Sequence, residues 1–341
     1  MKLRGLGIGS MVYGLGYGFS RPDFSSAEVD ISADGTVTIW NGASELGQGL
    51  RTALCQIAAQ ELGTPYEHTY IISSDTGSTP DAGPVSASRS IYVQGKAVVL
   101  ACQDLIIKLQ IIAADLLKAD VIKVQFSQGD FSEPGMNKVS IAKVAAECHK
   151  RGQSFRGSGW VNNYTSDVDP ETSQGDAYSS YAWASQLIEV EVDSETGQVK
   201  VLRIASATDA GKIINPLGAE GQIEGGAVQG LGFAIMENMI VEEGEYKNTS
   251  FSTYLIPTAA DVPPIDPLLV EVYDPTGPFG AKGIAEPATI ATIPAIMNAV
   301  ARAIGVRLYQ TPATAERILT ALGKLPMKEK LLSPEDIPYP P

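Results

Sequence analysis

Histidine and paired cysteine are scarce in this sequence, which narrows the chemistry that its own side chains can perform. His68 and His149 are the only histidines among 341 residues. A Ser/His/Asp triad or a histidine-rich metal site is therefore hard to assemble. The three cysteines, Cys55, Cys102 and Cys148, are far apart and form no Cys-x-x-Cys pair. Cys55 and Cys102 lie on apolar helical stretches, which is typical of core residues. The sequence thus predicts no side-chain ligand set for a metal.

Basic residues are also in deficit, with 25 Lys and Arg against 39 Asp and Glu, for a net charge of -14. This balance disfavours nucleic acid and an anionic membrane as partners, because both are polyanions. No apolar run reaches the ~18 residues with few charges that would span a bilayer. The first five residues, Met1 to Gly5, lack a continuous apolar signal core, so we expect a cytoplasmic location.

Two stretches of alternating polarity, each followed by a helical pattern, dominate the organisation of the chain. The first alternates around Asp34-Gly35 and the second around Thr196-Gly197, which are strong hairpin signals. Each leads into a segment with glycine and glutamine and then into a helix, and such self-similarity indicates related units. We therefore predict an α+β fold, with helices packed on sheets. Its expected parts are a first half over residues 1–177, a second half over 178–327 and an extended tail over 328–341.

Two other segments are not expected to be helical. Residues 5–18 carry six glycines and cannot form a stable helix. They form either an irregular segment that passes close to a cofactor or partner chain, or a glycine-rich strand packed against a neighbour. Residues 151–177 are polar and contain glycine, and we expect a long surface loop there.

Two helix entries have the composition of sites for anionic or polar groups. Gly47-Gln48-Gly49 opens a helical stretch, and such a turn offers free N–H groups and a side-chain amide. Its spacing matches neither a Walker loop nor a dinucleotide fingerprint. Further along, Ser86 to Ser90 places small hydroxyl residues and one arginine before a long helix, although capping alone would also explain the serines.

The most concentrated signal is Gly280 to Pro287, in which a lone lysine and a single glutamate accompany two glycines. Pro287 fits the first position of a helix, because its φ is fixed and its missing N–H is not needed there. Glu286 would then stand at the helix mouth as a carboxylate aimed into a site. The alternative is that Glu286 only gains from the favourable electrostatics of a helix start.

Five segments together resemble the xanthine dehydrogenase (molybdenum hydroxylase) family, in the C-terminal half of its molybdopterin-binding subunit. They occur in the family order and span nearly the whole chain, and they are residues 45–49, 86–90, 209–216, 221–225 and 280–287. The resemblance implies the fold of the family's second molybdopterin-binding domain. It also implies molybdopterin with molybdenum, in the cytosine dinucleotide form usual in bacteria. The family's metal has no side-chain ligand.

The resemblance assigns roles to individual residues of this chain. Glu286 matches the position of the family's catalytic base, and base catalysis is typically worth ~10²–10⁴ in rate. The expected cofactor-binding residues are Gly47, Gln48, Gly49, Ala87, Ser88, Arg89, Ser90, Gln222, Lys282 and Gly283. Tyr13, in the glycine-rich segment, is a candidate for the substrate pocket.

The family's other cofactor-binding half and its cluster-binding cysteines have no counterpart in this sequence. We therefore expect partners, namely a larger molybdopterin-subunit chain, an iron–sulfur subunit and an FAD subunit, as in the nicotinate dehydrogenases with a split molybdenum subunit. The expected reaction is hydroxylation of an N-heteroaromatic ring carbon, in nicotinate or a purine such as xanthine, with water as oxygen source. The alternatives are an aldehyde oxidoreductase of the same family and a non-catalytic carrier or assembly protein for the pterin cofactor.

Overall fold

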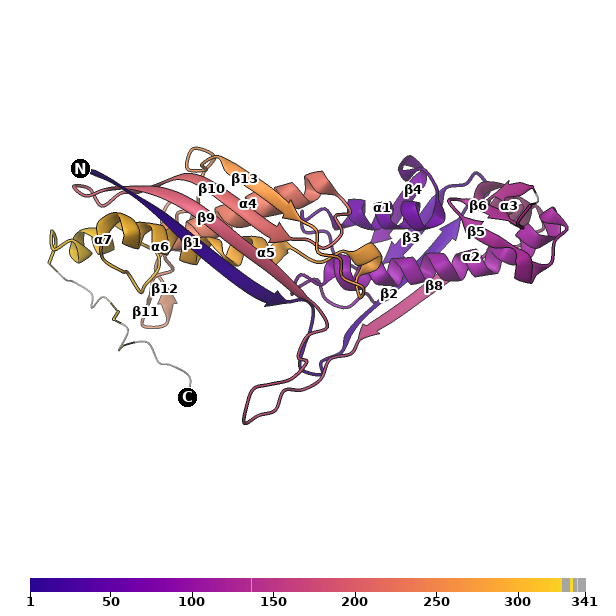
Figure 1. Ribbon diagram of the computed structural model, residues 1–341, viewed down its shortest axis with the longest axis horizontal. Coiled ribbons are helices and arrows are strands. Elements are labelled where there is room, and N and C mark those ends of the chain that lie inside the picture. Colours follow the sequence, from indigo (N-terminus) through magenta and orange to yellow (C-terminus); the bar gives the residue numbers. More distant parts are fainter. Residues whose placement is uncertain (136, 327–331, 334–335, 337–341) are drawn as a thin grey trace.

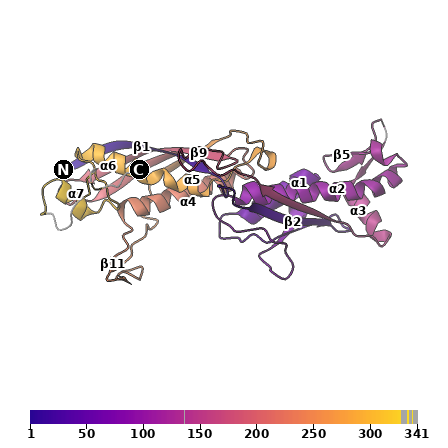
Figure 2. The same cartoon turned by 90° about the horizontal axis from the view of Figure 1, so that it is seen from below.

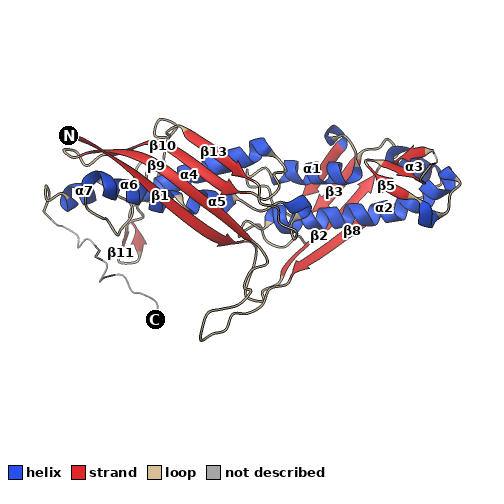
Figure 3. Ribbon diagram, in the orientation of Figure 1, coloured by secondary structure: helices blue, strands red, loops and turns tan. Residues whose placement is uncertain are grey.

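The computed structural model describes residues 1–135, 137–326, 332–333 and 336. Two units, each made of a four-stranded sheet with helices packed on it, lie end to end in an elongated molecule (Figure 1). Figure 3 shows helices and strands in both units, which confirms the predicted α+β class. The expected tail over residues 328–341 lies outside the described residues, apart from 332, 333 and 336.

The first unit is built on a sheet with the strand order β4-β3-β2-β8. Its strands are β2 (Asp23–Ile31), β3 (Val37–Asn41), β4 (Thr69–Ser73) and β8 (Arg156–Asn163). The predicted hairpin at Asp34-Gly35 is confirmed, since β2 and β3 pair antiparallel. Helix α1 (Leu50–Leu62) ends at Gly63, whose φ of 59° is left-handed as a C-cap requires. The long helix α2 (Gly95–Leu117) follows one π-helical turn over Ser90–Gln94.

Strand β8 occupies part of the segment that we expected to be a surface loop, so that expectation is wrong for residues 156–163. Gly157 and Gly159 explain the difference. A Cβ atom on either would lie 2.0 and 2.1 Å from the backbone oxygens of Ala101 and Ala97 in α2, respectively. The glycines therefore let the strand lie directly against a helix, a contact that no local polarity pattern reveals.

A smaller sheet at the far end of the first unit contains β5 (Gln125–Ser127), β6 (Asp130–Ser132) and β7 (Lys138–Ser140), followed by helix α3 (Ile141–Lys150).

The second unit has the strand order β1-β9-β10-β13. Its strands are β1 (Lys2–Gly14), β9 (Tyr181–Asp193), β10 (Val199–Asp209) and β13 (Ile265–Val270). Helices α4 (Pro216–Ile235), α5 (Ala285–Ile290) and α6 (Thr292–Ile304) pack on one face of this sheet (Figure 2). The remaining strands and α-helix are β11 (Val241–Glu242), β12 (Glu245–Tyr246) and α7 (Ala315–Ala321).

Strand β1 joins the second sheet, although it precedes all of the first unit in the sequence. It pairs with β9 along its whole length, from Lys2 with Asp193 to Gly14 with Tyr181. Residues 1–14 therefore lie in the sheet of the second half and not with the first half, where the sequence prediction placed them. Gly5, Gly7 and Gly9 face α6 and its N-cap Ala291 so closely that a Cβ atom on each would come within 2.3 Å of a backbone oxygen. Of the two interpretations of the glycine-rich segment, the structure shows the packed strand for residues 5–14.

Helix α4 begins earlier than the sequence pattern indicated. Asn215 caps it by accepting a hydrogen bond from the N–H of Gly218 at 3.0 Å, and Pro216 is its first residue. Gly221 and Gln222 therefore lie inside the helix and not in a turn before it. The cause is that the glycine-rich composition of this segment disfavours a helix locally, whereas burial against α5 and α6 stabilises one.

Two helices reach the length and apolar composition of membrane spans, residues Ser90–Leu117 and Ala285–Ile304. By length and composition, the expectation that no apolar run reaches the length of a membrane span is therefore wrong. Half of each apolar window is buried within the fold, where α2 packs on the first sheet and α6 on the second. Such burial is also the ordinary property of a core helix.

Candidate functional site

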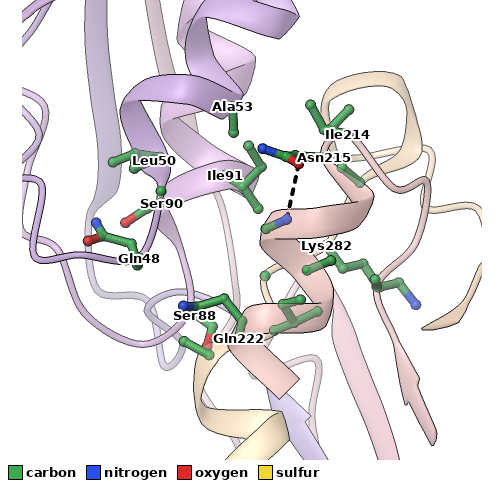
Figure 4. A pocket seen from close by; sticks show the side chains of 18 of the residues that line it. Gln48, Leu50, Ala53, Ser88, Ser90, Ile91, Ile214, Asn215, Gln222 and Lys282 are labelled. Carbon is green, nitrogen blue, oxygen red and sulfur yellow. Dashed lines mark hydrogen bonds between the residues drawn. The ribbon is translucent and has the colours of Figure 1, made fainter. Parts of the chain in front are cut away.

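A cavity of about 270 Å³ lies where the two units meet. Residues from the first unit form one wall, and residues from α4 and the loop before α5 form the other (Figure 4). The predicted site residues that line it are Gln48, Gly49, Ser88, Ser90, Gln222, Lys282, Gly283 and Glu286. The structure thus brings together two regions that the sequence separates by more than a hundred residues.

Glu286 is held at this cavity by Ser88. The Ser88 hydroxyl donates a hydrogen bond to Oε2 of Glu286, and Ser88 Oγ accepts one from the backbone N–H of Glu286 at 3.1 Å. Pro287 is the third residue of α5 and not its first, so Glu286 lies within the first helical turn. Ser88 has a left-handed φ of 48°, so a special backbone conformation accompanies the contact.

Gly283 places the loop before α5 against the segment that carries Ser88. A Cβ atom on Gly283 would lie 1.7 Å from the carbonyl oxygen of Ser88, a distance that no real side chain permits. Behind the loop, Gln186 of β9 donates to the carbonyl oxygen of Ala288 at 2.8 Å and accepts a hydrogen bond from Thr292. The position of Glu286 is therefore fixed by contacts to both units.

Lys282 lines the cavity, but its ammonium group is already paired. Its Nζ donates to Oδ2 of Asp209 at 2.7 Å, and both side chains are buried. This buried pair fastens the loop to the end of β10 and leaves the lysine with reduced freedom to bind a ligand.

The turn at Gly47-Gln48-Gly49 differs from the expected anion site in one respect. The carboxylate of Glu45 accepts hydrogen bonds from the N–H groups of Gly47 and Gly49 at 2.9 Å and of Arg51 at 3.0 Å. Burial opposes ionisation of this carboxyl group, but the three donors outweigh it and lower the pKa of Glu45. The chain's own carboxylate thus takes the N–H groups that the sequence prediction left free.

Arg89 is not among the residues that line the cavity, because its side chain points into the protein core. It is fully buried, and its Nε donates to Oδ1 of Asp23 at 2.5 Å. Its other nitrogens donate to the carbonyl oxygens of Ala82, Pro84 and Phe24. The guanidinium therefore organises the loop before Ser88 from behind, and the structure gives it no access to a ligand in the cavity.

Tyr13 and Ala87 line a neighbouring depression of about 300 Å³ together with Tyr17 and Tyr178. Burial and then the negative charge of Glu286 raise the pKa of Tyr13 to about 12. Tyr13 and Glu286 therefore interact electrostatically, although they line different cavities.

Several lining residues were missed by the sequence reasoning. Asn215 and the apolar side chains of Ile213 and Ile214 form the wall around α4. An asparagine followed by a proline is a recognisable helix start, so Asn215 could have been found from the sequence. The pairing of Ser88 with Glu286 had no local signal.

The fold and site together define a cofactor-binding domain of the molybdenum hydroxylase class, as the comparisons with known proteins show. Residues 1–263 match the family described as Molybdopterin cofactor-binding domain. The chain therefore belongs to the molybdenum hydroxylase (xanthine dehydrogenase) family. The predicted family is confirmed.

Three similar proteins illustrate the relationship. The 6-hydroxypseudooxynicotine dehydrogenase complex subunit gamma of Paenarthrobacter nicotinovorans is 34% identical, over 96% of this chain and 40% of that protein. The xanthine dehydrogenase molybdenum-binding subunit of Escherichia coli is 30% identical, over 92% of this chain and 41% of that protein. The crystal structure of quinoline 2-oxidoreductase from Pseudomonas putida 86 superposes with a TM-score of 0.82 and 27% identity, over 95% of this chain and 42% of that one. This chain thus spans about two-fifths of the length of these relatives.

The cavity fits part of a molybdopterin cofactor. The amide of Gln222 and the hydroxyl of Ser90 line it and make no hydrogen bond to other residues that the structure describes, so they are available to polar groups of a ligand. At about 270 Å³, the cavity is slightly smaller than the ~300–1,000 Å³ typical of small-molecule sites.

Proposed function

We propose that this chain is the smaller molybdopterin-binding subunit of a multi-subunit molybdenum hydroxylase. The reaction is hydroxylation of an N-heteroaromatic ring carbon, in nicotinate or a purine such as xanthine, with water as the oxygen source. Electrons pass to iron–sulfur clusters and FAD on partner chains, and the cofactor is the cytosine dinucleotide form of molybdopterin. The observation that carries the proposal is the Glu286 carboxylate, fixed by Ser88 on the wall of a cavity that also presents free amide and hydroxyl groups.

The side chains of this chain have separate parts in the mechanism. Ser90 and Gln222 hold polar groups of the cofactor by hydrogen bonds. Gln48, whose amide accepts a hydrogen bond from the N–H of Leu46 and donates one to the carbonyl oxygen of Ser44, contributes its second N–H. The cofactor, when bound, supplies the two-electron redox chemistry. Glu286 accepts a proton on its carboxylate. Ser88 orients that carboxylate through a hydrogen bond to Oε2, so the other oxygen, Oε1, stays available for the proton. A carboxylate fixed in this way loses little conformational entropy at the moment of reaction.

Substitution of Glu286 by glutamine tests the proposed role directly. The Glu286→Gln variant is purified with its partner chains, and its molybdenum and released cytosine nucleotide are measured to establish that the cofactor is loaded. We expect substrate-dependent reduction to fall by ~10²-fold or more, because the amide cannot accept the proton. The matched control is Glu67→Gln, an exposed carboxylate of the first unit that does not line the cavity, and it should retain the original rate.

Reduction at near the original rate in a fully loaded Glu286→Gln complex would contradict the proposal. A substrate series then separates the neighbouring possibilities. Turnover of nicotinate or xanthine supports the heteroaromatic reaction, whereas turnover of aldehydes alone indicates an aldehyde oxidoreductase. Cofactor binding without turnover of either class indicates a carrier or assembly protein.

A further inference from the structure

The outer face of the second sheet, opposite α4 and α6, is divided into a charged end and an apolar end. Along β1 and β9 the residues alternate between the two faces, so every second side chain points outward. At the end of the sheet near the cavity most of the larger outward residues are apolar, and one polar pair, Ser10 with Ser185, lies among them. We define this apolar end by Ile8, Val12, Trp183, Leu187, Leu268 and Val270, whose exposed fractions range from 40% to 59%.

The apolar end extends across the strands on both sides of the Ser10–Ser185 pair, whose hydroxyls are hydrogen-bonded to each other at 2.9 Å. Val12 pairs with Trp183 and Ile8 pairs with Leu187 between β1 and β9. Leu187 in turn pairs with Ala205, and Ala207 pairs with Leu268 on the last strand. These side chains therefore form one surface and are not isolated exposed residues. Scattered apolar residues are normal on a protein surface, whereas a contiguous patch marks a contact surface.

The other end of the same face carries charged side chains in ion pairs. Lys2 pairs with Glu191 at 3.0 Å, Arg4 with Glu189 at 3.5 Å, and Arg203 with Asp266 at 2.6 Å. In each of these ion pairs at least one of the two side chains is exposed to solvent. The change from ion pairs to apolar side chains within one sheet face indicates that only the end near the cavity is covered in the assembled protein.

The inner face of the sheet is already fully used, since β1 packs its glycines directly against α6. Strands that are apolar on both faces are typical of a sheet covered on both sides. A depression of about 630 Å³ lies on the apolar end, between Val12, Trp183 and Val270. Lys282 lines both this depression and the candidate cavity, so a cover seated here would also lie beside the functional site.

We propose that the apolar end is the docking surface for the larger molybdopterin-binding chain. The proposal rests on the proposed function only in the identity of this partner. The two relatives match 92–96% of this chain, but this chain matches only 40–41% of their length. Most of the polypeptide of these relatives therefore has no counterpart in this chain, and a second chain would supply it.

A second copy of this chain is a poorer candidate for the partner on this surface. Two copies with a net charge of -14 each repel one another, and an apolar contact between them must overcome that repulsion.

Binding measurements on charged variants test this docking surface. The probe is the larger chain from the same source, chosen because it matches the part of the relatives that this chain does not. Trp183→Asp and Leu268→Asp place a charge on two different strands of the apolar end. The matched control is Ile122→Asp, an equally apolar-to-charged change at a side chain that is 87% exposed on the other unit.

We expect each variant of the apolar end to raise the Kd for the larger chain by about thirtyfold or more, as for residues central to an interface. Ile122→Asp should leave the Kd unchanged. Thermal unfolding of each isolated variant establishes that the exposed substitutions leave the fold intact. Sedimentation of this chain alone shows whether it self-associates.

Three results would overturn the inference. The first is that Trp183→Asp and Leu268→Asp give the same Kd as the control Ile122→Asp. The second is that the unaltered chain does not bind the larger chain. The third is that this chain forms a homodimer and that Trp183→Asp dissociates it. The binding assay needs no turnover, so its outcome is independent of the Glu286→Gln experiment. Persisting activity in Glu286→Gln contradicts the proposed function alone, whereas unchanged binding by the variants contradicts the docking surface alone.

Discussion

Ser88 and Glu286 lie 198 residues apart in the sequence, yet they exchange two hydrogen bonds across the boundary between the two units. One bond orients the carboxylate and the other holds the backbone of the helical turn that carries it. The candidate base and the cavity wall are therefore positioned by the same serine.

Removal of the Ser88 hydroxyl should impair turnover more than substrate binding. A hydrogen bond to a charged group contributes ~1.5–3 kcal/mol, so Ser88→Ala is expected to lower kcat by about 10–100-fold in the loaded complex. The KM should change little, because the serine acts on the carboxylate and not on the substrate. The control is Ser179→Ala at an exposed loop hydroxyl. A kcat equal to that of the control would show that Glu286 needs no such orientation.

Gly283→Ala should destabilise the chain, because the new methyl group would lie 1.7 Å from the Ser88 carbonyl oxygen. Two backbone segments have to separate to accommodate it, and we expect a loss of about 3 kcal/mol or more in the free energy of unfolding. Gly225→Ala in α4 is the contrasting variant, with no neighbour within 4 Å of the added Cβ atom. It should stabilise the helix by ~0.5–1 kcal/mol. Urea unfolding of the two variants would yield similar midpoints if the Gly283 contact were unimportant.

Lys282→Met should leave Asp209 as an uncompensated buried charge. Breaking one partner of such a pair costs about 3–5 kcal/mol of stability. The exposed pair of Lys212 with Glu271 is the control, because Lys212 follows Asp209 by three residues and Lys212→Met should cost ~1 kcal/mol or less. The double variant Asp209→Asn with Lys282→Met should recover much of the loss. If it is as unstable as the single variant, packing of the lysine stem and not charge pairing explains the effect.

Tyr13 should ionise only in strongly alkaline solution, because burial and then the charge of Glu286 raise its pKa to about 12. In the unfolded chain a tyrosine titrates near pH 10. Between pH 10 and 12 the unfolded chain loses the Tyr13 proton while the folded chain keeps it. The contribution of Tyr13 to the free energy of unfolding is therefore fully present below pH 10 and is lost as the pH rises toward 12. Difference absorbance between the native protein and Tyr13→Phe measures this titration. A tyrosinate signal at pH 10 would contradict the burial of the phenol beside Glu286.

The fate of Arg89 shows where sequence reasoning failed at the site. An arginine among serines at a helix entry is typical of an anion site, and that pattern is present here. The side chain nevertheless points into the core and pairs with Asp23, which lies 66 residues earlier. The direction of a side chain depends on the backbone conformation and on distant partners, neither of which is encoded in the neighbouring residues.

Local physics determined a large part of this protein from the sequence. Turn chemistry at Asp34-Gly35 and Thr196-Gly197 set both hairpins, and Gly63 ended α1, because hairpin and cap geometry depend on residues close together in the chain. The ordered motifs also identified the family and the candidate base Glu286. Only the tertiary structure decided which segments meet. It placed β1 beside β9, held Glu286 against Ser88 and exposed an apolar sheet face near the cavity. These contacts join residues more than a hundred positions apart, and their free energy comes from packing that forms only when the whole chain has folded.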